Sequence, residues 1–214
     1  MSGLDPEVER VIIEALGKLR GAGATLVEAE LAEAIHAAPR IADTIILYET
    51  MSSITSFLQK EGTGVSFDQM LAQASEGMQA RMKAVVLPPG RPTRERYESM
   101  LLQREQLKAA IRLYFEANGV SALAFPPTRI PPPKIGEEEF EIRGQRVSLS
   151  AATARNIALG SCASMASLVL PAGLTANGLP VGLEFAGLPG TDRDILALGL
   201  SVEKVLGPIP APRI

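Results

Sequence analysis

The chain has 214 residues, of which 46% are hydrophobic and 21% charged, and its formal net charge is −3. This balance is that of an ordinary globular protein with a real core, and it gives no electrostatic case for binding nucleic acid or an anionic membrane. With a single cysteine, one histidine and no apolar run near the roughly 20 residues of a membrane span, the sequence predicts a cytoplasmic protein without disulfides or structural zinc.

The first predicted elements follow from capping and punctuation signals. Asp5 and Pro6 are typical of a helix start, and a pair of glycines ends the helix that follows. Residues Ala24–Leu31 alternate apolar side chains with glutamates, the pattern of a strand with one wet face. Pro39 is predicted to open a helix that runs to Gly62.

The middle of the chain is predicted to be helical. Ser66 and Gln69 have the spacing of a capping box, which predicts a third helix up to about Val86. The stretch LPPGRPT, residues 87–93, interrupts the pattern, and a long amphipathic helix follows until Asn118-Gly119. Its predicted stripe consists of Tyr97, Leu101, Arg104, Leu107, Ile111 and Tyr114.

A change of pattern begins at residue 120. The run VSALAFP, residues 120–126, is continuously apolar, which predicts a strand buried on both faces. The proline-rich stretch 126–136 excludes regular structure, and the charged residues 137–147 predict a loop or a weak hairpin. Residues 153–166, TARNIALGSCASMA, are rich in small side chains, as where backbones approach closely.

The last predicted elements are two strands and a helix. The strands are Leu168–Leu170 and Leu179–Leu188, joined by a glycine- and asparagine-marked turn. The helix starts at Thr191, with Asp194 as its capping-box partner. Its predicted apolar face consists of Ile195, Leu198, Val202 and Leu206.

Three segments together resemble amidase-signature hydrolases. Residues 120–136 resemble the family's strand-then-proline segment, and residues 155–212 resemble its C-terminal segment. Residues 4–31 resemble the helix and strand that follow its central region. GLPVGLE at 178–184 and GTDRDILALG at 190–199 are a specific signal in combination, and the pattern is nearest to the mandelamide and indoleacetamide hydrolases.

The resemblance implies a fold and an incomplete active site. The implied fold is α/β: residues 1–214 as a single domain, the C-terminal half of the amidase-signature fold, with a mixed twisted sheet of a few strands packed with several helices. That family acts through a Ser–Ser–Lys triad whose nucleophile lies in a glycine-rich segment of its N-terminal half. Here the one adjacent serine pair is Ser52-Ser53, in a helical pattern without glycines. The chain therefore holds no predicted catalytic residue, and its expected partner is the missing N-terminal half of the same enzyme.

The resemblance also points to substrate-binding residues. Where the subgroup reads G-S-N-A-G-I-P-G, residues 160–167 read G-S-C-A-S-M-A-S, so that a cysteine replaces an amide, a serine a glycine and an alanine a proline. This loop is expected to border the acyl pocket. The implied substrate-binding residues are Ser161, Cys162, Ala163, Ser164 and Met165. Arg155, just before them, meets either a substrate carboxylate or a structural partner.

The implied function is hydrolysis of a small carboxylic amide to acid and ammonia through a serine acyl-enzyme, with no cofactor or metal. This chain would supply sheet strands and part of the pocket, and alone it is expected to be inactive. A non-catalytic small-molecule or partner-binding module is the alternative. Because a half-sheet leaves apolar surface and a strand edge in water, we also expect a homo-oligomer.

Three other patterns have weaker chemical interpretations. Cys162 and His36 allow a nucleophile and base, but nothing in the local sequence favours a reactive thiol, and GSCAS fails the G-x-S-x-G motif. Residues 137–141 carry four glutamates without the ligand alternation of a calcium loop, which favours a solvated loop. The stretch PPTRIPPP resembles a ligand of SH3 domains but fits better as an ordered connection after a strand.

Overall fold

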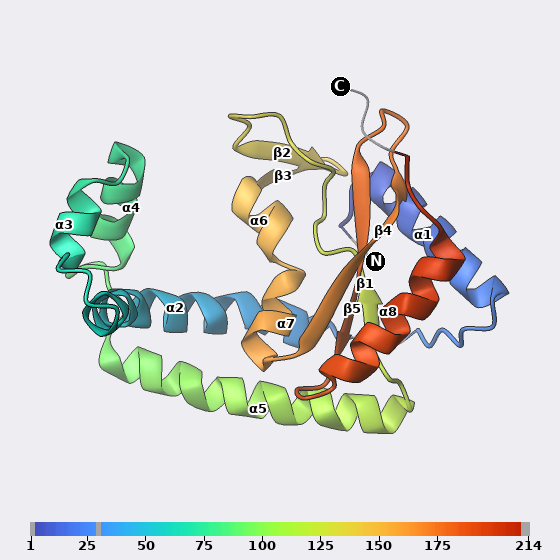
Figure 1. Cartoon of the computed structure of the whole chain (residues 1–214), viewed down its shortest axis with the longest axis horizontal. Coiled ribbons are helices and arrows are strands. Elements are labelled where there is room, and N and C mark those ends of the chain that lie inside the picture. The colour runs from blue at the N-terminus through green and yellow to red at the C-terminus, as the bar shows by residue number, and fades with distance from the viewer. Residues whose placement is uncertain (1–2, 29–30, 211–214) are drawn as a thin grey trace. The chain divides into compact units, whose positions relative to one another are not determined.

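The computed structural model describes residues 3–28 and 31–210 (Figure 1). The chain divides into two compact units. The first consists of Met1–Pro39 together with Leu107–Ile214, and the second of Arg40–Gln106.

The first unit is built on a three-stranded antiparallel sheet. Its strands are β1 (Leu123–Phe125), β4 (Ala166–Leu174) and β5 (Pro180–Gly187), in the order β1-β5-β4. β4 and β5 form a hairpin, whereas β1 reaches β5 from a distant part of the chain. The register places Phe125 opposite Glu184 and Val169 opposite Glu184 on the other side.

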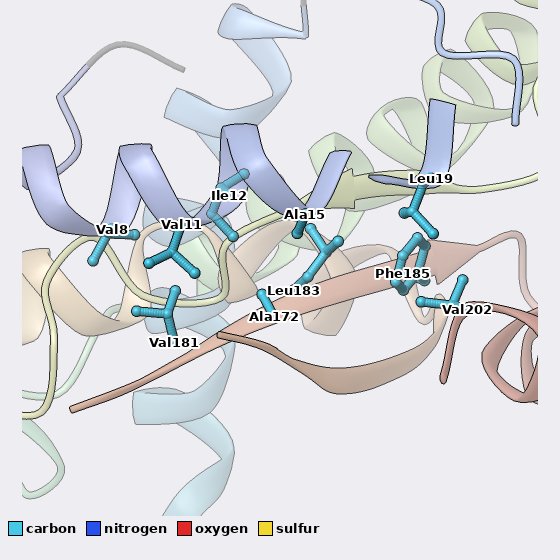
Figure 2. Packing of buried hydrophobic residues seen from close by; sticks show 10 residues of the cluster. All are labelled: Val8, Val11, Ile12, Ala15, Leu19, Ala172, Val181, Leu183, Phe185 and Val202. Carbon is cyan, nitrogen blue, oxygen red and sulfur yellow. The ribbon is translucent and has the colours of Figure 1, made fainter. Parts of the chain in front are cut away.

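Two helices pack on one face of this sheet, α1 (Pro6–Gly21) and α8 (Asp192–Leu206). Alternate residues of β5 point toward α1, as Figure 2 shows for Val181, Leu183 and Phe185. The buried cluster consists of Val8, Val11, Ile12, Ala15, Leu19, Ala172, Val181, Leu183, Phe185 and Val202. The predicted helix start is confirmed, because Asp5 Oδ1 accepts hydrogen bonds from the N–H groups of Glu7 and Val8.

A small second layer lies beside the sheet in the same unit. The hairpin β2 (Glu139–Ile142) and β3 (Gln145–Ser148) confirms the hairpin interpretation of the charged stretch. Two short helices follow it, α6 (Leu149–Ala154) and α7 (Ile157–Ala163). The proline-rich connection between β1 and β2 contains neither helix nor strand, as expected.

The second unit is helical. It consists of α3 (Phe67–Ala72), α4 (Glu76–Val85) and parts of the two long helices α2 (Ala32–Lys60) and α5 (Arg94–Asn118). The rings of Tyr48 and Tyr97 stack with centroids 4.1 Å apart, and the Arg91 guanidinium lies 4.1 Å from the Tyr48 centroid. None of the described helices combines the length and the apolar character needed to cross a membrane.

The helix boundaries differ from the prediction at two places. α2 begins at Ala32, not at Pro39, and contains the proline. The missing N–H removes one backbone hydrogen bond, but the neighbours Ala38 and Ile41 are buried and hold the helix through packing. The third predicted helix is two helices, because the Ser75 hydroxyl accepts from the N–H of Met78 and starts α4 anew.

The strand predictions also need correction. Residues 24–28 and 31 form no strand, and residues 29–30 of that prediction lie outside the described residues; an alternating pattern needs a neighbouring strand, and this stretch pairs with none of the described strands. The run at 120–126 gives only the short edge strand β1, in which Ala124 is exposed, so burial on both faces was wrong. β4 is longer than predicted, with a bulge between Pro171 and Gly173.

The start of the last helix is confirmed but its cap is not. Thr191 precedes α8 without a side-chain cap, since its Oγ1 instead donates to the carbonyl of Leu188 at 2.7 Å. The predicted apolar face is confirmed, with Ile195 and Val202 buried and Leu198 packed against the core.

Candidate functional site

The predicted substrate-binding residues lie at the C-terminal end of α7. The first three, Ser161, Cys162 and Ala163, belong to the last turn of this helix, so the prediction of a loop was wrong there. Cys162 and Ala163 are buried, at 4% and 2% exposure, whereas Ser161 and Ser164 are exposed and Met165 is half-buried. Within this segment, Ser161, Ser164 and Met165 are therefore the side chains that a ligand can reach.

The backbone turns sharply after α7. Ser164 has a left-handed conformation, with φ 58° and ψ 37°, and ends the helix. The N–H of Met165 donates to the carbonyl of Gly160 at 2.9 Å, which closes the turn and directs the chain into β4. Glycine is the usual residue in this left-handed conformation. Here the residue is Ser164, the position at which a serine replaces the second glycine of the pattern G-S-N-A-G-I-P-G.

The start of α7 is fixed beside β1. Asn156 Nδ2 donates to the carbonyl of Pro126 at 2.8 Å, directly after the end of that strand. Small residues then let α7 approach the sheet: a β-carbon on Gly160 would lie 3.3 Å from Ser167 Oγ and 3.7 Å from Glu184 Oε1. Gly160 thus lies close to side chains of the sheet, while the close approach of two backbones stays a prediction.

Glu184 is the residue that the sequence analysis missed. It lies on the central strand β5 with 4% exposure, between the apolar register partners Phe125 and Val169. Burial raises the pKa of the Glu184 carboxyl, and a side-chain hydrogen bond with Ser167 opposes this effect. The signal in the sequence was a single acidic residue inside the apolar run PVGLEFAG.

The side chains of two arginines, Arg129 and Arg155, both lie beside Gly3. Arg129, 6% exposed, donates from Nε to the carbonyl of Gly3 at 2.6 Å, and a β-carbon on Gly3 would lie 2.9 Å from Arg129 Nη2 and 3.4 Å from Arg155 Nη1. Burial and the positive charge of Arg155 lower the pKa of Arg129. Arg155 thus lies close to Gly3, and both of its predicted roles, toward a substrate carboxylate or a structural partner, stay predictions.

The rival chemical interpretations gain nothing from the geometry. His36 is exposed on α2, while Cys162 is buried on α7. Among residues 3–28 and 31–210, no three His, Cys, Asp or Glu side chains gather closely enough to hold a metal ion. In the glutamate-rich stretch, Glu139 pairs with Arg146 across the β2–β3 hairpin at 2.9 Å, as a solvated hairpin does.

A small apolar hollow of about 270 Å³ lies elsewhere, between β4 and the end of α8. It is lined by Leu170, Pro171, Glu203, Leu206, Gly207, Pro208 and Ile209. The predicted pocket residues 161–165 do not contribute to it.

The sequence of the chain is similar to those of two characterised hydrolases. The chain is 28% identical to mandelamide hydrolase of Pseudomonas putida over 98% of its own length and 42% of that protein. It is 29% identical to indoleacetamide hydrolase of Agrobacterium vitis over 95% of its length and 44% of that protein. The chain therefore spans less than half the length of these curated relatives, and it corresponds to their C-terminal part.

Solved structures agree with the fold. The crystal structure of an amidase, 26% identical, superposes with a TM-score of 0.72 over 95% of this chain and 43% of the amidase. A 6-aminohexanoate cyclic dimer hydrolase, 19% identical, superposes with a TM-score of 0.69 over 95% of this chain and 42% of that one. The Amidase family model matches residues 1–196, and the chain belongs to the Amidase family.

Proposed function

We propose that this chain is the C-terminal part of an amidase that hydrolyses a small carboxylic amide to an acid and ammonia. The family match over residues 1–196 carries the proposal. The two named relatives, a mandelamide hydrolase and an indoleacetamide hydrolase, support an amide as the substrate. The reaction would pass through a serine acyl-enzyme whose Ser–Ser–Lys triad lies outside these 214 residues, and it would need no cofactor.

In this proposal residues 1–214 are one portion of a single larger domain, located in the cytoplasm. The chain contributes strands to a larger sheet and one wall of the substrate pocket. The exposed end of α7 is the proposed wall, with Ser161, Ser164 and Met165 as its accessible side chains and Cys162 and Ala163 as its buried ones. The anchoring of Asn156 to Pro126 supports a wall of fixed position.

A reconstitution experiment tests this function. The purified 214-residue chain is assayed for ammonia release from mandelamide and indole-3-acetamide, alone and fused to the part of Pseudomonas putida mandelamide hydrolase that precedes the aligned region. We expect no turnover by the chain alone and turnover by the fusion. Intact mandelamide hydrolase is the positive control, and circular dichroism confirms that the fusion is folded.

The other outcomes separate the alternatives. Turnover by the chain alone that disappears in Cys162→Ala would contradict the proposal and favour a cysteine nucleophile paired with His36. A folded but inactive fusion, together with saturable binding of an amide by the chain alone, would favour the non-catalytic binding module.

We further propose that the isolated chain self-associates. Two strands, β1 and β4, are edges of the described sheet, and Val169 on β4 is 50% exposed. Apolar side chains in water and an unpaired strand edge favour association. Sedimentation at micromolar concentration is expected to give a dimer or a larger species. A monomer at all concentrations would contradict this, as would association abolished by changes in residues 137–141.

A further inference from the structure

α7 rests on a buried acid. Gly160 of this helix lies close to β4 and β5, since a β-carbon added to it would be 3.3 Å from Ser167 Oγ and 3.7 Å from Glu184 Oε1. The opposite face of the sheet is filled by α1 and α8 around Leu183 and Phe185, the sequence neighbours of Glu184. Glu184 thus belongs to the face that α7 covers.

Within residues 3–28 and 31–210, no charged side chain shifts the pKa of this carboxyl. The register partner from β1 is Phe125, those from β4 are Val169 and the diagonal Ser167, and α7 contributes Gly160. The one titratable side chain of α7 is the thiol of Cys162. The pKa of Glu184 is raised by burial and lowered only by the Ser167 hydrogen bond, with no contribution from another charged group. A buried carboxyl among apolar partners is stable as the neutral acid and costly as the anion.

We propose that the protonated carboxyl of Glu184, together with Ser167, is the positioning device that holds α7 against the sheet. Since residues 161–165 form the last turn of α7 and the turn that follows it, Glu184 sets where this proposed pocket wall stands. The pocket role rests on the proposed function, whereas the docking of α7 does not. Glu184 is a positioning residue and not a catalytic one, because its own side chain is buried, at 4% exposure.

The proposal predicts a direction with pH. An acid whose pKa is raised in the folded state stabilises the fold fully below its ordinary value of about 4.3, and that stability is lost as the pH rises through the raised value. At pH values above the raised pKa, the Glu184 carboxylate is ionised while it is still buried. We therefore expect α7 to separate from the sheet more often at these pH values, a motion called opening below. Opening exposes Cys162, which lies on the same helix and is the only cysteine of the chain.

Labelling of this single thiol measures the opening. The full chain is mixed with 5,5′-dithiobis(2-nitrobenzoate) over a series of pH values, and each rate is divided by that of the denatured chain at the same pH, which cancels the ionisation of the thiol itself. In the wild-type chain the normalised rate should rise with pH, by at most about tenfold per pH unit. In Glu184→Gln, which keeps the shape and cannot ionise, it should stay flat.

Two further variants complete the test. Ser167→Ala removes the hydrogen bond that lowers the pKa of Glu184, so the rise in labelling should begin at higher pH than in the wild-type chain. Glu203→Gln, an exposed change on α8, should reproduce the wild-type profile. Equal pH profiles in the wild-type chain and Glu184→Gln would overturn the proposal. If Glu184→Gln does not fold, an unshifted Ser167→Ala profile would overturn it as well. These labelling results test the role of Glu184 alone and do not test the proposed hydrolysis of an amide.

Discussion

Gly199 of α8 lies so close to Leu168 of β4 that a β-carbon on Gly199 would be 2.2 Å from Leu168 Cδ2. The next nearest atoms, Leu168 Cγ and Leu170 Cδ1, would be 3.6 Å and 3.9 Å away, so Leu168 is the residue that fills this space. Glycine inside a helix costs about 1 kcal/mol relative to alanine. At this position that cost is offset by the close packing of α8 on β4.

The contact predicts a change of sign in a double-mutant cycle. Gly199→Ala should lower the free energy of unfolding by about 1 kcal/mol in the wild-type chain, because overpacking outweighs helix propensity. In a Leu168→Ala background it should raise that free energy by about 0.5–1 kcal/mol, because only the propensity gain remains. Urea unfolding gives both values. Gly17→Ala, in open space on α1, should be stabilising in both backgrounds. The same sign for Gly199→Ala in both would exclude Leu168 as the limiting contact.

The left-handed Ser164 gives a second prediction. Ser164→Gly should stabilise the chain by about 0.5–1 kcal/mol, since glycine adopts this conformation without a steric penalty, and Ser164→Val should destabilise it by at least about 1 kcal/mol. Thermal unfolding of the two variants measures both effects. A less stable glycine variant would mean that the contacts of the serine side chain outweigh backbone strain.

Gly90 of the second unit gives a third prediction. A β-carbon there would lie 1.7 Å from the carbonyl oxygen of Ala84, and because this atom belongs to the backbone it cannot rotate away. Gly90→Ala should therefore destabilise the chain by more than about 2 kcal/mol. The matched control is Gly77→Ala in α4, where nothing lies within 4 Å and a small stabilisation is expected. Hydrogen exchange of residues 67–106 measures both, and equal protection in the two variants would refute the prediction.

Tyr97 gives a prediction with pH. Its hydroxyl donates to the Glu49 carboxylate at 2.6 Å, and this hydrogen bond, more than burial, raises the pKa of Tyr97 above the ordinary phenol value of about 10. The stabilisation is present below that ordinary value and is lost as the pH rises through the raised one. Tyr97→Phe should lower the free energy of unfolding at neutral pH by about 1 kcal/mol.

Phenolate absorbance checks the assignment. The titration of the wild-type chain should contain a late step that Tyr97→Phe removes. Tyr114→Phe should leave that step in place, although burial also raises the pKa of Tyr114. A late step that survives Tyr97→Phe would assign it to another tyrosine.

Local signals in the sequence identified much of the fold. Asp5 and the pair Ser66 and Gln69 cap helices as expected, because a cap depends on residues within one turn. The strands around Leu170 and Leu183 were also found, since an apolar run bounded by turn residues is a local pattern. The small residues around Gly160 predicted a loop, and the helical form of this segment was missed because small residues are compatible with both loop and helix.

The features that depend on distant residues were not predictable. Glu184 is buried because β1 pairs with β5 and places Phe125 beside it, and no local pattern encodes that register. Pro39 was expected to start a helix, but the packing of Ala38 and Ile41 carries α2 through it. Of the candidate site, the sequence supplied residues 161–165 by resemblance, while the acid beneath them became visible only in the folded sheet.

The core in Figure 2 joins α1, near the beginning of this sequence, to β5 and α8, near its end. During synthesis, α1 must therefore leave the ribosome and wait until most of the remaining residues have followed. At about 5–20 residues per second this wait lasts on the order of ten seconds or more. Throughout it, β4 and β5 are not yet present to cover the apolar stripe of Val8, Ile12 and Leu19. Chaperone capture of nascent chains is thus expected to depend on this stripe, and to end when the β4–β5 hairpin emerges.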